Sequence, residues 1–180
     1  MPLVPQDIPP ELSAIAQEAD RIHESALYSA QGQFEQAKLW RALNMILGVP
    51  AAALAAVSGG TALSNPDSTP VAGILALAAA ALTATLTTVN ASRRMTQAQT
   101  SANAYLALQT AARQFLTIDL MKLNYDDART ALKQLTVQRD ELNNTADPPS
   151  AYARWRAKNT IIGGGQRYDV DSQEKQKGVQ

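Results

Sequence analysis

The side chains that most often carry out chemistry are scarce in this chain. His23 is its single histidine and cysteine is absent, so neither a Cys/His metal site nor a Ser/His/Asp set is indicated. We interpret His23 as a surface or partly packed side chain of a helix. The sequence therefore predicts no enzyme, no metal site and no cofactor.

Two short motifs resemble functional sites, but helix ends explain them better. Asp126 and Asp127 could be metal ligands, yet acidic residues directly after Asn124 are typical of a helix start, where carboxylates meet the positive end of the helix dipole. The three glycines at 163–165 lack the preceding strand and the Gly-Lys-Ser sequence of a phosphate-binding loop. We interpret them as the end of a helix.

The C-terminal region is locally basic, although the net charge of the chain is zero. A neutral chain gives no general basic field, so we expect no direct nucleic-acid binding. The local cations could contact lipid headgroups, bind an acidic partner or form a solvated face, and the sequence leaves these alternatives open. They are Arg154, Arg156, Lys158 and Arg167.

The most informative feature is an apolar stretch, residues 42–92, in which Asp67 is the one charged residue. Two apolar runs, 42–63 and 71–89, flank a break at 64–70, whose Asn-Pro and Thr-Pro pairs disfavour a continuous helix. Each run has about the 20 residues that a helix needs to cross a bilayer. The stretch therefore predicts a transmembrane helical hairpin.

Small residues recur every four positions along both apolar runs. Such ridges let a second helix approach closely, which is the main packing device in lipid. We expect helices to pack through Gly48, Ala52, Ala56 and Gly60 in the first run, and through Ala72, Ala76, Ala80 and Ala84 in the second.

A polar stripe formed by Thr83, Thr87 and Asn90 follows one side of the second run. These side chains either form hydrogen bonds between helices or line a pore, and both interpretations place them against protein or water. Neither run contains an ionisable residue, which argues against a proton carrier that needs a carboxylate inside the membrane. One hairpin cannot enclose a channel, so permeation would require a homo-oligomer.

Basic residues flank the predicted hairpin and set its expected orientation. Lys38 and Arg41 precede the first run, Arg93 and Arg94 follow the second, and the connecting break has no Lys or Arg. The positive-inside rule then places both termini in the cytoplasm and the connection outside. The N-terminus resembles no secretory signal, because it has no basic region followed by an apolar one.

The rest of the chain predicts an all-α protein whose polar helices pack as a cytoplasmic bundle of the coiled-coil type. We expect an extended segment at 1–10, a helix at 11–41, a cytoplasmic helical region at 93–165 and a polar tail at 166–180. Helices should cover 95–123, 124–143 and 151–162, with Ser150 capping the last. Their predicted core positions are Leu12, Ile15, Ala19, Ile22 and Ala26, then Tyr105, Leu108, Ala112 and Phe115, then Ala128, Leu132, Leu135 and Leu142.

This order of elements resembles the SLATT family, the SMODS and SLOG-associating two-transmembrane effector domains. A helix ending in Lys38-Leu39-Trp40-Arg41 enters the hairpin, and the chain leaves it through Asn90 and Arg93-Arg94. The segments that continue the resemblance are Ala104–Leu108, Tyr125–Arg129, the Pro-Pro pair, and the last helix with Tyr152, Ala157-Lys158, Ile161 and Gly164, leading to Tyr168.

The resemblance implies a membrane effector of bacterial antiviral and conflict systems. Such a protein would oligomerise in the inner membrane and permeabilise or depolarise it. A separately encoded trigger, such as a nucleotidyltransferase or a nucleotide sensor, would activate it. Two alternatives remain: a membrane-anchored scaffold that recruits a cytoplasmic partner, and a soluble helical bundle with the hairpin as its core.

Overall fold

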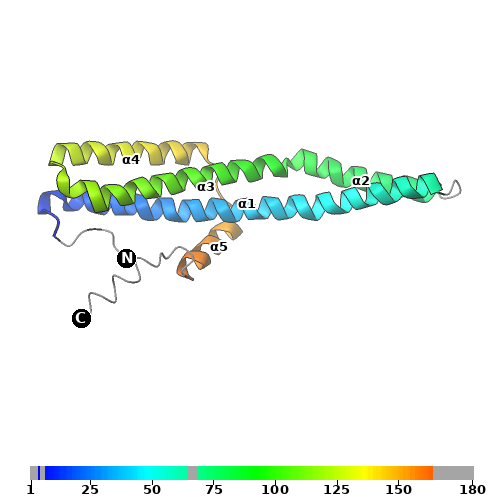
Figure 1. The fold of residues 1–180 in the computed structure, drawn as a ribbon, viewed down its shortest axis with the longest axis horizontal. Coiled ribbons are helices and arrows are strands. Elements are labelled where there is room, and N and C mark those ends of the chain that lie inside the picture. The colour runs from blue at the N-terminus through cyan, green and yellow to red at the C-terminus, as the bar shows by residue number, and fades with distance from the viewer. Residues whose placement is uncertain (1–3, 5–6, 65–68, 164–180) are drawn as a thin grey trace. The chain divides into compact units, whose positions relative to one another are not determined.

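The computed structural model describes residues 4, 7–64 and 69–163. Within these ranges every regular element is helical, which confirms the all-α prediction. The α-helices are α1 (Pro10–Ser64), α2 (Thr69–Val89), α3 (Ala91–Gln114), α4 (Tyr125–Thr145) and α5 (Ala151–Ile162), as Figure 1 shows. Most of the predicted break at 64–70 and the predicted tail at 166–180 lie outside the described residues.

The chain divides into two compact units that share α1 and α3. The first unit contains Met1–Glu35 and Gln99–Gln180, and the second contains Gln36–Ala98. In sequence, α1 continues without interruption from the predicted polar helix into the first apolar run. The second unit contains both predicted apolar runs, 42–63 and 71–89, and their basic flanks.

In the first unit, residues of α1, α3 and α4 contribute to one apolar core. Its buried residues come from all three helices and from the turn after α3. The predicted stripes of α1 and α3 are confirmed, since each of their residues is buried, and Leu132 and Leu142 of α4 pack at the edge of the core. The largest fully buried side chains are Ile22, Leu116 and Leu120.

The end of α3 differs from the single helix expected to Leu123. A π-helical turn, Phe115–Asp119, follows α3, and a 3₁₀ turn, Leu120–Lys122, follows that. The backbone N–H of Leu120 donates to the carbonyl of Phe115. This wider turn accommodates an extra residue and lets Phe115, Leu116 and Leu120 all enter the core.

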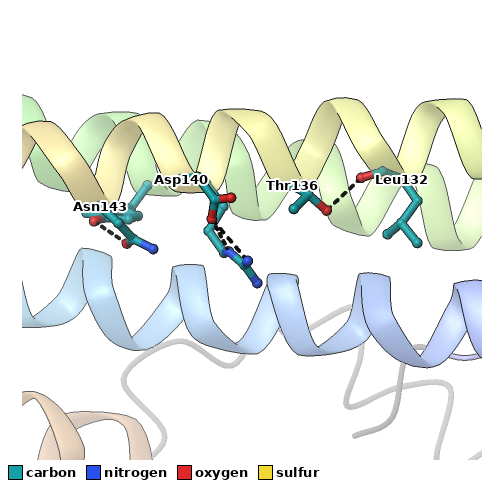
Figure 2. A network of polar contacts seen from close by, with 6 residues as sticks. Leu132, Thr136, Asp140 and Asn143 are labelled. Atoms are coloured by element: carbon teal, nitrogen blue, oxygen red, sulfur yellow. Dashed lines mark hydrogen bonds and ion pairs between the residues drawn. The ribbon is translucent and has the colours of Figure 1, made fainter.

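Polar contacts lie near both ends of α4. Asn124 Oδ1 accepts from the Asp127 N–H at 2.9 Å, and Asn124 Nδ2 donates to Asp127 Oδ2 at 2.8 Å, which confirms the predicted helix start. Near the other end, Tyr105 Oη on α3 donates to Asn143 Oδ1 at 2.9 Å. Figure 2 shows Asn143 on α4 with the neighbouring contacts of Asp140 and Thr136. Burial raises the pKa of Tyr105, so its phenol stays a protonated donor.

The predicted last helix is confirmed at its two ends. Ser150 Oγ accepts from the Ala153 N–H at 3.3 Å, and Gly163 follows the last helical residue, Ile162. The Gly163 N–H donates to the carbonyl of Asn159 at 2.9 Å. The interpretation of Gly163 as a helix end therefore holds, while Gly164 and Gly165 lie outside the described residues.

Candidate membrane-spanning hairpin

Within the second unit, α1 and α2 pack through a narrow line of small side chains. Ala51 and Ser58 of α1 are buried, as are Ala72 and Ala79 of α2. The members of each pair stand seven residues apart, which is about two helical turns and keeps them on one face. We call these four residues the hairpin seam.

A buried hydrogen bond fixes the register of the seam. Ser58 Oγ donates to the carbonyl of Ala72 across the two helices at 2.7 Å. Nearer the polar end of the hairpin, a Cβ built on Gly48 would lie 3.5 Å from Leu86 Cδ1, which is an ordinary van der Waals distance. Gly48 of α1 therefore lies next to Leu86 of α2. The two helices are therefore antiparallel and in close contact.

An aromatic residue and a basic residue meet where the first apolar run begins and the second ends. The Arg94 guanidinium lies 5.3 Å from the centre of the Trp40 ring, and Arg94 Nε donates to the carbonyl of Val89 at 3.2 Å. Arg94 thus satisfies a carbonyl at the C-terminus of α2, where a cation is favoured by the helix dipole. We call Trp40, Arg94 and the neighbouring cations Lys38, Arg41 and Arg93 the hairpin base.

The hairpin base has the composition of a membrane–water boundary. Lys38, Arg41, Arg93 and Arg94 are exposed, so the four residues predicted to set the topology present their charges outward. Tryptophan is enriched at headgroup level because its ring is apolar and its N–H is polar. Sequence reasoning did not predict the contact between Trp40 and Arg94, although both residues stand in the motifs quoted above.

Asn90 is a backbone break rather than a continuation of the second apolar helix. Its φ is 54°, and among the described residues it is the one non-glycine with positive φ. Asparagine tolerates the left-handed conformation better than other L-residues. The Asn90 N–H donates to Leu86 and its carbonyl accepts from Arg94, so the backbone stays bonded while the chain passes from α2 to α3.

The threonines of the predicted polar stripe bond within their own helix. Thr83 Oγ1 donates to the carbonyl of Ala79, and Thr87 Oγ1 donates to that of Thr83, both at 2.9 Å. Thr85 and Thr88 make the same bond to the fourth residue before them. Because their donors are satisfied internally, these hydroxyls can face lipid at less cost than an unbonded hydroxyl could.

Most residues of the two predicted small-residue ridges lie on outer surfaces of the hairpin. Gly48 faces Leu86, and Ala72 is buried in the seam. The other six residues are exposed within the chain: Ala52, Ala56, Gly60, Ala76, Ala80 and Ala84. The sequence did not predict the burial of Ala51, Ser58 and Ala79. The seven-residue spacing of the seam residues could have indicated it, but many other small residues in the two runs have the same spacing.

Two helical segments, Pro10–Ser64 and Pro70–Lys122, are long and apolar enough to cross a membrane. Only 11% of the most apolar window of each is buried within the chain. A soluble bundle with the hairpin as its core would bury these windows. Exposed apolar side chains include Met45, Ile46, Val57, Ile74 and Leu77.

His23 and Asp127, which were considered first as candidates for chemistry, make contacts typical of side chains that stabilise the fold. His23 is partly buried, with its Nε2 3.4 Å from Gln109 Nε2, and burial lowers its pKa. Asp127 takes part in the cap of α4. Among the described residues no group of three or more His, Cys, Asp or Glu could hold a metal ion.

Comparisons of the chain with protein-family models, curated proteins and solved structures find no match. The resemblance to SLATT proteins therefore stays a prediction from the order of elements and motifs.

Proposed function

We propose that this chain is a membrane effector of the SLATT type. Its hairpin inserts two helices into the bacterial inner membrane with both termini in the cytoplasm. Several copies assemble, and a separately encoded trigger shifts them to a state that permeabilises or depolarises the membrane. The observation that carries the proposal is the apolar surface that α1 and α2 leave exposed.

The arrangement of charges supports insertion as a hairpin. Residues 42–64 and 69–92 contain no Asp, Glu, Lys or Arg, so both helices can lie in hydrocarbon without burying a charge. In sequence, the cations of the hairpin base flank the same end of the two helices, and the Trp40 ring lies against one of them, Arg94. This is the pattern that the positive-inside rule and the aromatic belt describe.

The exposed small-residue ridges support assembly. Within one chain the seam occupies one face of each helix, and most ridge residues remain uncovered. In lipid, small residues let helices of different subunits approach closely. The trigger must bind the leaking assembly more tightly than the resting one, because a ligand of equal affinity for both states shifts no population.

A voltage-sensitive dye in expressing cells tests the proposal. The protein is produced alone and together with the products of the genes beside its own. We expect depolarisation when the trigger is present, and the absence of depolarisation in every condition contradicts the proposal. A fractionation control shows whether the protein reaches the membrane.

Matched threonine variants test whether the predicted stripe faces a pore. The pair Thr83→Val with Thr87→Val removes its two hydroxyls, and the pair Thr85→Val with Thr88→Val removes two that bond in the same way. If the stripe lines a pore, the first pair changes the ion flux and the second does not.

The second candidate is a membrane-anchored scaffold that recruits a cytoplasmic partner. It is favoured by the internal hydrogen bonds of the four threonines, because a hairpin whose hydroxyls are satisfied needs no water-filled lumen. Charged substitutions at Thr83 or Thr87 separate the two functions. A pore should change its conductance, whereas a scaffold that still inserts should keep its activity.

A further inference from the structure

The short helix α5 is held on α1 through its small residues and one ion pair. Ala153 and Ala157 are buried on that side of the helix. Arg156 Nε lies 3.2 Å from Oε2 of Glu35, whose carboxylate is almost fully buried. The preceding loop also contacts α1, since Gln33 Nε2 donates to the carbonyl of Asp147 at 2.6 Å.

A glycine on α1 allows the loop to approach closely. Gly32 is buried, and a Cβ built on it would lie 3.2 Å from Pro149 Cγ. Together with the contacts of Gln33 and Glu35, this contact determines which side of α5 faces α1. Because α5 is held on α1 by these contacts, its opposite face is a fixed surface that stays exposed.

The outward face of α5 carries large apolar side chains where a soluble helix would be polar. Trp155 is 58% exposed, Ile162 67% and Tyr152 50%. At about 3.6 residues per turn, Trp155 and Ile162 lie roughly opposite the buried Ala153 and Ala157. The Tyr152 and Trp155 rings lie 5.9 Å apart, so the aromatic surface is continuous.

Cations flank this apolar face on both sides, and α5 contains no Asp or Glu. On the same helical projection, Arg154 and Lys158 fall on one side of Trp155, while Arg156 falls on the other, near Tyr152. Arg156 is paired with Glu35. Arg154 and Lys158 are exposed and form no ion pair among the described residues, so they leave a net positive surface.

We propose that the outward face of α5 binds the anionic headgroup region of a membrane. Tryptophan and isoleucine would enter the interface, and Arg154 and Lys158 would meet lipid phosphates. Aromatic and aliphatic side chains beside Lys and Arg are typical of helix faces that lie at a membrane interface. The proposal rests on the membrane location proposed above, but it requires neither oligomers nor permeation.

Glu35, which pairs with Arg156, stands three residues before Lys38 of the hairpin base in the sequence of α1. An anionic lipid is the occupant that satisfies both the cations and the aromatic rings. Each cation near an anionic surface should strengthen binding about fivefold.

The two tryptophans allow a test on the full-length protein. In a Trp40→Phe variant, Trp155 is the single tryptophan. The variant is reconstituted into phosphatidylcholine vesicles with or without about a third phosphatidylglycerol, and emission is measured with quenchers attached to lipid headgroups. We expect a blue shift and headgroup quenching of Trp155 in the anionic vesicles, reduced by salt through screening.

Charge variants and a matched control sharpen the test. Lys158→Gln should lower the ratio of lipid-bound to free α5, read from the headgroup quenching of Trp155, about fivefold. Lys133→Gln, at an exposed lysine of α4, should leave this ratio unchanged. Equal quenching in neutral and anionic vesicles, or a Trp155 accessible to aqueous iodide in both, would overturn the proposal.

A second single-tryptophan variant separates this inference from the proposed function. In Trp155→Phe, the remaining Trp40 reports whether the hairpin base reaches the membrane. Lipid quenching of Trp40 without quenching of Trp155 refutes only the role of α5. A water-exposed Trp40 refutes the hairpin insertion, and the response of Trp155 still decides whether α5 binds anionic lipid.

Discussion

Replacing Ala79 with leucine should loosen the hairpin, whereas the same change at Ala80 should not. Ala79 is 6% exposed and lies in the seam, while its neighbour Ala80 is exposed. A branched butyl side chain at Ala79 must displace α1, which approaches closely enough for Ser58 to bond Ala72 at 2.7 Å. Overpacking of this kind costs about 1–3 kcal/mol.

The hydrogen bond of the seam should contribute less than its packing. In Ser58→Ala the bond to the Ala72 carbonyl is lost, but the change in volume is small. Hydrogen bonds between membrane helices contribute about 0.6 kcal/mol on average. We therefore expect Ser58→Ala to lower the free energy of unfolding less than Ala79→Leu does.

A denaturing-detergent titration in micelles measures these differences. In a Trp155→Phe background the fluorescence of Trp40, which contacts Arg94 in the hairpin base, follows separation of the helices. The Ala79→Leu transition should come at a lower denaturant fraction than those of the parent and Ala80→Leu. Equal midpoints for the two leucine variants would refute the register of the seam.

Three further predictions concern the helix ends and the histidine. Asn90→Gly should leave stability near that of the parent, whereas Asn90→Val should lower it by about 1–2 kcal/mol because a β-branched residue is strained at positive φ, as thermal unfolding will show. Asn124→Ala should cost about 1 kcal/mol through loss of the α4 cap, measured in the same assay, with Asn144→Ala as a control. Burial lowers the pKa of His23 below its unfolded value of 6.5, so the unfolded state takes up a proton first and stability should fall as the pH drops below about 6.5. In His23→Gln this part of the pH dependence should disappear, and an unchanged profile would contradict the assignment.

The helices of the first unit could be predicted because their sequence has strong contrast. Apolar residues recur there at three- and four-residue spacing among polar ones, so Ile15, Ile22 and Leu108 were expected to face a core. Asn124 and Ser150 indicated helix starts because their side chains can accept hydrogen bonds from the free N–H groups of the first turn. The wider turn at Phe115–Asp119 gave no such signal, since core packing determines it.

The amino-acid sequence alone determined that two uncharged apolar runs exist, that both are long enough to cross a membrane, and which cations flank them. Only the tertiary structure decided which faces of those helices meet, because nearly every position in the runs is small or apolar and no periodic contrast marks one side. The same holds for the pairing of Glu35 with Arg156, which the loop before α5 brings together from distant parts of the chain. Packing geometry, and not local residue preference, selects among such equivalent surfaces.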